Sequence, residues 1–106
     1  SSRKGILVKE SEGKYYFLNA LNGHLLPVSL NANPLTCLLS EKILYIGTDK
    51  GLFEFDLDNL KMSQVTSMDN QVINSIEQLD DEVWISSNNG IYKKSEDRFI
   101  MQRRSI

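Results

Sequence analysis

Short hydrophobic runs alternate along the whole chain with turns rich in Gly, Asn, Asp and Ser. Apolar runs of this length, punctuated in this way, are typical of β-strands joined by tight hairpins. The only stretch with helix-like spacing, residues 57–62, is too short for a stable helix. The pattern therefore predicts an all-β chain.

The turns recur with a fixed period. Gly13, Gly51 and Gly90 each follow an apolar run and a polar turn, and they are separated by 38 and 39 residues. A repeat of about 40 residues that holds four strands is typical of a β-propeller blade. We therefore expect about three four-stranded antiparallel sheets, which together form a single segment, 1–106, of a larger propeller. Its units lie roughly at 1–30, 31–69 and 70–106.

The expected strands follow from laying the units over one another. They are 6–10, 15–19 and 24–28 in the first unit, 35–39, 43–47, 51–56 and 61–67 in the second, and 73–79, 82–86, 91–94 and 98–102 in the third. The first unit has only three strands, and its Asn22-Gly23 pair favours a tight type I′ turn. Gly51 and Gly90 close turns where positive φ is expected.

Inner strands of a propeller lie between two other blades, so they should be apolar on both faces. Leu44-Tyr45-Ile46 and Val83-Trp84-Ile85 have this character. We expect Tyr45 and Trp84, which share one repeat position, to pack between blades and not to act as stacking platforms for a sugar.

The composition of the chain limits the classes of function that it can have. The chain has 106 residues, of which 41% are hydrophobic and 25% charged, as in an ordinary globular domain. Its net charge of −2 favours neither nucleic acid nor direct contact with an anionic membrane surface.

The single Cys37 and the single His24 allow no intrachain disulfide and no zinc cluster. We expect no cofactor, no metal and no catalytic residue; Cys37 is expected to be a small core residue. The start without Met indicates a processed or excised chain, and we favour a fragment.

Two segments carry a family resemblance. Residues 43–53, Ile-Leu-Tyr-Ile-Gly-Thr-Asp-Lys-Gly-Leu-Phe, resemble the "L-W-I-G-T-x-x-G-L-Y" pattern of the two-component regulator propeller repeat. Residues 83–92 follow it too, with Ser86 and Ser87 in place of Gly-Thr. The resemblance covers roughly residues 33–94; residues 16–23 instead resemble the repeat of quinoprotein-type propellers.

The resemblance implies a periplasmic sensor segment. Such repeats form propellers in bacterial hybrid histidine kinases, many of which sense oligosaccharides. The implied role is non-enzymatic: an oligosaccharide or other small ligand binds, and a histidine kinase outside this chain reads the change. The expected partners also include the remaining blades of a parent protein, or copies of this chain. An alternative is a protein–protein interaction propeller, and a quinoprotein-like enzyme fragment is a third.

Candidate ligand residues lie on the loops that crowd one face of a propeller. Here these loops are 11–12, 31–33, 48–50, 69–71 and 87–89, and they are rich in Asn, Asp, Ser and Gln. Amides and carboxylates suit the recognition of hydroxyl groups, although turns favour the same residues. We take Asn33, Asp49, Asn70, Gln71 and Asn88 as the candidate ligand-binding residues.

Overall fold

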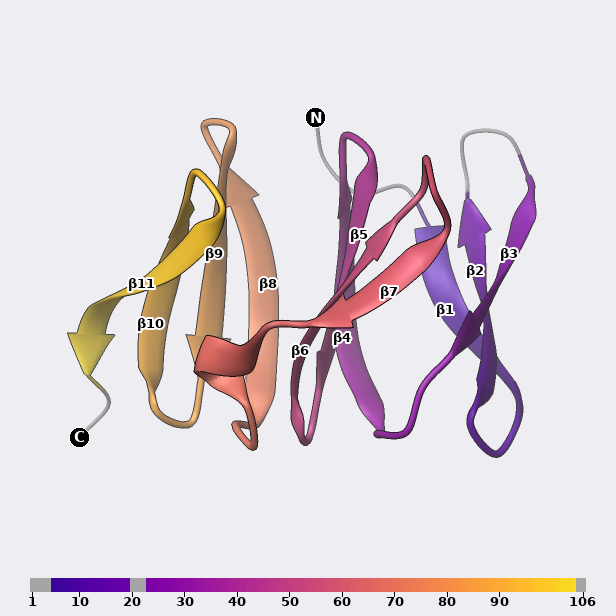
Figure 1. Ribbon diagram of the computed structural model, residues 1–106, viewed down its shortest axis with the longest axis horizontal. Helices are drawn as coiled ribbons and strands as arrows, with labels where there is room; N and C mark the ends of the chain where they lie inside the picture. The colour runs from indigo at the N-terminus through magenta and orange to yellow at the C-terminus, as the bar shows by residue number, and fades with distance from the viewer. Residues whose placement is uncertain (1–4, 20–22, 105–106) are drawn as a thin grey trace.

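Three antiparallel sheets stand side by side in the computed structural model, which describes residues 5–19 and 23–104 (Figure 1). The predicted all-β fold with sheets of propeller-blade type is confirmed. Asn22, in the predicted type I′ turn, lies outside the described residues.

Each sheet is a run of sequential hairpins. The first sheet holds β1 (Gly5–Ser11), β2 (Lys14–Asn19) and β3 (Leu25–Ser29). The middle sheet holds β4 (Pro34–Ser40), β5 (Ile43–Thr48), β6 (Gly51–Asp56) and β7 (Lys61–Gln64). The third sheet holds β8 (Ile73–Leu79), β9 (Glu82–Ser87), β10 (Gly90–Ser95) and β11 (Arg98–Arg104).

One strand is shorter than predicted. The strand expected over 61–67 ends at Gln64, and the 3-10 helix η1 (Thr66–Met68) follows it. This turn places Met68, which is fully buried, into the core between the middle and third sheets. Leu30, in the linker from β3 to β4, is buried in the same way between the first and middle sheets. An apolar residue in the linker thus seals each junction between sheets.

Within the described residues, the first sheet has no counterpart of the leading strand of the other two. Ser11 pairs with Lys14 across a two-residue turn, as Thr48 pairs with Gly51, so β1 corresponds to β5. Gly13 (φ +78°) therefore occupies a turn position, one residue earlier than Gly51. Among the described strands, β4 and β8 lie against each other, and nothing in the first sheet takes the equivalent place.

Two hydrophobic clusters hold the sheets together, one at each junction. Leu44 and Ile46 of β5 face the first sheet, whereas Tyr45 on the same strand faces the third sheet. The expected burial of β5 on both faces is therefore confirmed. In β9 only one face is buried, because no described sheet covers the other. Trp84 lies half-buried on the open face, so its expected packing between blades stays a prediction.

Gly47 marks a close approach between the middle and third sheets. A Cβ atom at this position would lie 2.5 Å from Ile73 Cγ2 and 2.8 Å from Thr36 Cγ2. Side chains cannot pack that closely, so β8 can approach β5 because residue 47 has none. This close contact explains why the Ile-Gly-Thr segment of the middle sheet has a glycine at this position.

Candidate functional site

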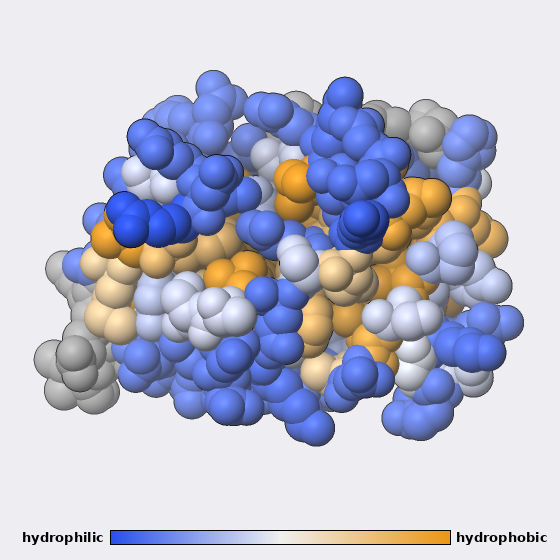
Figure 2. Space-filling view, in the orientation of Figure 1, coloured by the Kyte–Doolittle hydropathy of each residue, from blue (hydrophilic) through white to orange (hydrophobic). Residues whose placement is uncertain are grey.

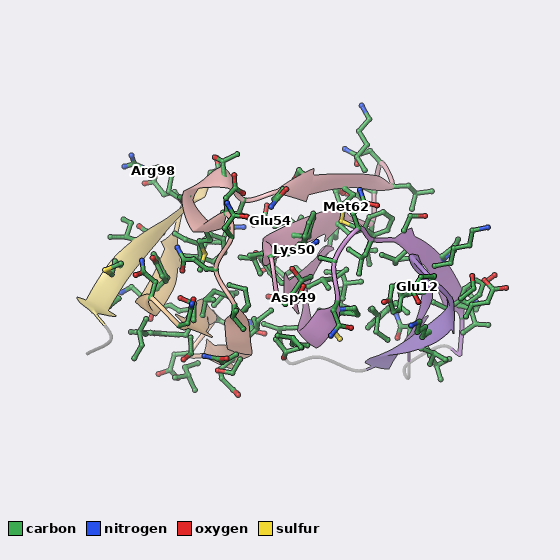
Figure 3. The ribbon with its side chains drawn as sticks, turned by 90° about the horizontal axis from the view of Figure 1, so that it is seen from below. Glu12, Asp49, Lys50, Glu54, Met62 and Arg98 are labelled. Atoms are coloured by element: carbon green, nitrogen blue, oxygen red, sulfur yellow. The ribbon has the colours of Figure 1, made fainter. Side chains whose placement is uncertain are left out.

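The candidate site lies at the end of the molecule where the loops β1–β2, β5–β6 and β9–β10 meet the two linkers between sheets. We call this end the linker face; it is the lower end in Figure 1, and Figure 3 looks onto it. Hydrophilic residues cover the loop-bearing ends, and hydrophobic residues fill the band between them (Figure 2).

A groove of ≈ 450 Å³ opens on the linker face between the first and middle sheets. We call it the linker-face groove. It is lined by Glu12, Gly13, Tyr15, Leu30, Asn31, Ala32, Asn33, Asp49 and Lys50. Two carboxylates, two amides and one ammonium therefore surround a hollow that has a tyrosine and a leucine in its wall. Such a set can donate and accept hydrogen bonds in several directions.

Asp49 has a structural task beside any binding role. Its Oδ1 accepts a hydrogen bond from the backbone N–H of Asn33 at 3.0 Å, and its own N–H donates to the Asn33 carbonyl at 3.1 Å. At the next junction, Asn88 Oδ1 and N–H make the same two bonds with the backbone of Val72. Asp49 in the β5–β6 turn and Asn88 in the β9–β10 turn therefore hold their linkers in the same way, one with a carboxylate and the other with an amide. Only Asp49 brings a negative charge.

The turn next to this clamp is fixed by a hydroxyl group. Thr48 Oγ1 donates to the Gly51 carbonyl at 2.7 Å and accepts from the Lys50 N–H at 3.0 Å. Ser87 Oγ accepts a hydrogen bond from the Asn89 N–H in the third sheet. The hydroxyl group of Thr48 therefore fixes the conformation of the β5–β6 turn, whose residues Asp49 and Lys50 line the groove.

Asn70 and Gln71, the candidates in the linker before the third sheet, lie in a different environment. Gln71 accepts a hydrogen bond from Ser87 Oγ at 2.6 Å and donates to Tyr92 Oη at 3.1 Å, so both ends of its amide are occupied. Asn70 is exposed with φ +63°, and its backbone N–H donates to the Lys50 carbonyl at 3.2 Å. Gln71 is thus part of a half-buried network that fixes the linker.

The structure brings two of the five candidates into one groove. Asn33 and Asp49 line it together, whereas Asn70, Gln71 and Asn88 lie at the junction of the middle and third sheets. Sequence reasoning marked the loops of Glu12 and Lys50 without choosing these residues. Tyr15 was missed altogether. The one feature of the sequence that could have indicated Tyr15 is its position directly after a turn, near the start of β2.

A larger groove of ≈ 660 Å³ opens at the opposite end, between the middle and third sheets. Its wall includes Tyr45 and Lys94, and Lys94 Nζ lies 2.7 Å from Tyr45 Oη and 3.2 Å from Glu54 Oε2. Nζ also sits 4.9 Å from the Tyr45 ring centre and 5.7 Å from that of Phe99. This cluster ties the two sheets together.

The lysine and the tyrosine of this cluster keep their protons at neutral pH. Burial disfavours the Lys94 ammonium, but the Tyr45 hydroxyl and then Glu54 outweigh burial and raise the pKa of Lys94. Burial also raises the pKa of Tyr45, and Lys94 offsets this effect only in part. A charged lysine and a neutral tyrosine suit an electrostatic tie, and neither form is a base or a nucleophile.

The remaining candidate groups carry little chemistry. Within residues 5–19 and 23–104, no three His, Cys, Asp or Glu residues are arranged to hold a metal ion. Cys37 is half-buried and packs against the cluster between the first and middle sheets, and His24 is exposed. The part of the chain that the structure describes has no helix long and apolar enough to cross a membrane.

Comparison of the chain with models of known protein families, with curated proteins and with solved structures gives no match. The resemblance to the two-component regulator propeller repeat therefore stays a prediction. The linker-face groove and its residues carry the functional argument.

Proposed function

We propose that this chain is a non-enzymatic ligand-binding segment of a propeller-type sensor, and that it binds an oligosaccharide in the linker-face groove. The observation that carries the proposal is the groove itself, where Asn31, Asn33, Asp49 and Glu12 present amide and carboxylate oxygens from three loops of two sheets. Sugar hydroxyls both donate and accept hydrogen bonds, so they match such a mixed set of groups.

The signalling part of the proposal rests on the repeat resemblance. In this proposal the segment lies in the periplasm and belongs to a bacterial two-component system, whose histidine kinase is outside this chain. Ligand in the groove would contact loops of both the first and the middle sheets. A ligand can shift an equilibrium only by its differential affinity for two states, and bridging two sheets favours the arrangement in which their loops stay together.

The test is a binding screen with soluble oligosaccharides, followed by calorimetric titration of any hit against three variants. Asp49→Asn keeps the acceptor that fastens Asn33, because Asn88 performs that task at the equivalent position. It removes the charge and replaces the second carboxylate oxygen with an NH2 donor. Asn31→Ala removes an exposed amide that lines the groove. Asn88→Asp is the matched control, since it makes the reverse exchange outside the groove.

We expect Asp49→Asn and Asn31→Ala each to weaken binding about tenfold or more, which corresponds to one hydrogen bond with a charged or polar group. Asn88→Asp should leave the affinity unchanged, and all three proteins should unfold like the parent chain. Saturable binding that ignores both groove variants would refute the proposed site. The absence of any binding oligosaccharide would refute the proposed ligand class.

A protein-binding scaffold is the second candidate, and a separate observation favours it. Leu60, at the end of the β6–β7 turn, is 60% exposed and lines a groove with Leu26, Pro27, Phe55 and Met62, and a contiguous apolar surface suits a protein partner. Substitution Leu60→Ser should weaken such an interaction and leave oligosaccharide binding unchanged. The two functions are therefore separable in one set of variants.

A further inference from the structure

The two linkers differ at the residue directly before the one that the clamp holds. At the junction of the middle and third sheets, Gln71 precedes Val72, whose backbone is clamped by the β9–β10 turn. At the junction of the first and middle sheets, Ala32 precedes Asn33, whose backbone is clamped by the β5–β6 turn in the same way. Ala32 therefore stands next to its clamp where Gln71 does, and its side chain ends at Cβ.

The carboxamide of Gln71 is held by polar groups of the third sheet at both of its ends. Its oxygen accepts a hydrogen bond from Ser87 Oγ at 2.6 Å, and its NH2 group donates to Tyr92 Oη at 3.1 Å. Asn89 Nδ2 also donates to Tyr92 Oη, at 3.2 Å. An amide group from the chain itself thus fills the space between the linker and the neighbouring turn at this junction.

At the first junction a groove opens beside the alanine. The linker-face groove of ≈ 450 Å³ has Ala32 in its wall, where a glutamine side chain would extend toward the middle sheet. Thr48 and Phe53 hold the repeat positions of Ser87 and Tyr92. Phenylalanine has no hydroxyl group, so the chain does not rebuild the same internal amide site here. The place of an amide is open to a ligand.

The groove has its own partners for an amide group. Lys50 brings an ammonium group that donates hydrogen bonds, and Asp49 brings a carboxylate with acceptor sites on both oxygens (Figure 3). Asp49 Oδ1 already holds the linker, which leaves Oδ2 as the acceptor for a ligand. Ala32, Leu30 and Tyr15 supply an apolar wall. A ligand group with one N–H, one carbonyl and one small apolar end matches this set.

We propose that the linker-face groove recognises oligosaccharides through an acetamido group on a sugar ring, in the place that the Gln71 carboxamide fills at the next junction. This inference rests on the proposed function and names its substrate class, the N-acetylated sugars. The acetamido N–H donates to Asp49, the acetamido carbonyl accepts from Lys50, and the methyl group lies against Ala32. A hydroxyl group at the same ring position fills only part of this space.

The first experiment is calorimetric titration of the whole chain with three matched trisaccharides. They are the N-acetylglucosamine trimer chitotriose, the glucose trimer cellotriose and the glucosamine trimer, which differ only in an acetamido, a hydroxyl or an amino group beside the anomeric carbon. We expect chitotriose to bind at least about tenfold more tightly than either of the others, because it adds a hydrogen-bonded amide and a buried methyl group.

The outcomes separate this inference from the proposed function. Equal affinity for chitotriose and cellotriose, weakened alike by Asn31→Ala, would overturn the acetamido inference and leave the proposed function standing. Tightest binding of the glucosamine trimer would also overturn it, because the carboxylates would then be selecting a cation. If none of the three trimers bound, the inference would be wrong, while a different oligosaccharide that binds in the groove would still support the proposed function.

Lys50→Met tests the donor to the acetamido carbonyl. The backbone N–H and carbonyl of Lys50 hold the turn, so the change removes only the side-chain ammonium from the groove. We expect chitotriose affinity to fall about tenfold and cellotriose affinity to change little. Lys61→Met, at an exposed lysine on β7, is the matched control and should bind like the parent chain. An unchanged preference for chitotriose in Lys50→Met would contradict the assigned donor.

A double variant tests the place of the acetamido group. Ala32→Gln combined with Phe53→Tyr supplies both the carboxamide and the hydroxyl that the later junction has in Gln71 and Tyr92. This variant should bind chitotriose at least about tenfold more weakly, because its own amide fills the groove. Phe53→Tyr alone is the control and should keep the parent affinity. Circular dichroism establishes that each variant is folded; a folded double variant with parent affinity would overturn the proposal.

Discussion

Gly47→Ala tests the reasoning about how closely the middle and third sheets approach. The added Cβ would meet Ile73 Cγ2 at 2.5 Å, Ile73 Cβ at 2.8 Å and Thr36 Cγ2 at 2.8 Å. Ordinary contacts between carbon atoms are about 3.5–4.0 Å, so the sheets must separate or Ile73 must leave its rotamer. Ile73 is fully buried, which leaves it little room to move.

The expected cost is that of overpacking a core, about 1–3 kcal/mol in the free energy of unfolding. A strand alanine has an advantage over glycine of roughly 0.5–1 kcal/mol in backbone entropy, which offsets part of this cost. Because the 2.5 Å approach to fully buried Ile73 places the cost in the upper part of that range, about 2–3 kcal/mol, we expect a net loss of about 1–2.5 kcal/mol. In a domain of this size that loss lowers the melting temperature by roughly 4 °C or more.

Urea unfolding followed by circular dichroism measures the effect, and two further proteins make the test specific. Ser86→Ala alters the equivalent position on the open face and should change stability by less than about 0.5 kcal/mol. Adding Ile73→Ala to Gly47→Ala removes the colliding methyl group, so the double variant should lose less than the sum of the two single losses. If Gly47→Ala were as stable as the parent chain, the close approach would not be the reason for the glycine.

Three further predictions concern the turn, the cross-sheet tie and the clamp. Thr48→Val should cost about 1–3 kcal/mol in urea unfolding because it leaves buried turn groups unpaired, whereas Thr48→Ser should restore most of that loss. Raised pKa values of Lys94 and Tyr45 mean that the folded chain binds more protons than the unfolded chain above about pH 10. Stability should therefore fall as pH rises through that range, and Tyr45→Phe should flatten the fall, because it removes one group with a raised pKa and the hydroxyl that raises the pKa of Lys94; an unchanged slope in this variant would contradict the assignment. Asp49→Ala should cost roughly 0.5–1.5 kcal/mol through loss of the clamp, whereas Asp49→Asn should cost almost nothing; equal losses would show that charge, not the acceptor, fastens the linker.

The strand pattern was predictable from the sequence because hairpins are local. Each strand pairs with its neighbour in the chain, so apolar runs and turn residues are enough to place it. The end of β7 was not predictable in this way. Val65 continues the apolar spacing of the strand, but the chain must turn there so that Met68 can enter the junction with the third sheet. That requirement arises from another sheet and leaves no local signal.

The site was predictable only as a set of loops. Turn residues and ligand-binding residues share the same chemistry, so the sequence could not separate Asp49, which lines a groove, from Gln71, which is held in a network. The packing of Trp84 between blades stays a prediction for a different reason. Its repeat position correctly indicates a surface that packs in the middle sheet, but whether a sheet covers it depends on what stands next to the third sheet.

The two separate clusters have a consequence for how the molecule opens. Each cluster couples the middle sheet to one neighbour, so the three sheets form a linear array with nearest-neighbour coupling. An outer sheet can open while the remaining junction stays intact, whereas the middle sheet can open only if both junctions break. Backbone amides of β5 should therefore exchange with deuterium more slowly than those of β2 or β10. A ligand in the linker-face groove would slow exchange in the first sheet before it affected the third.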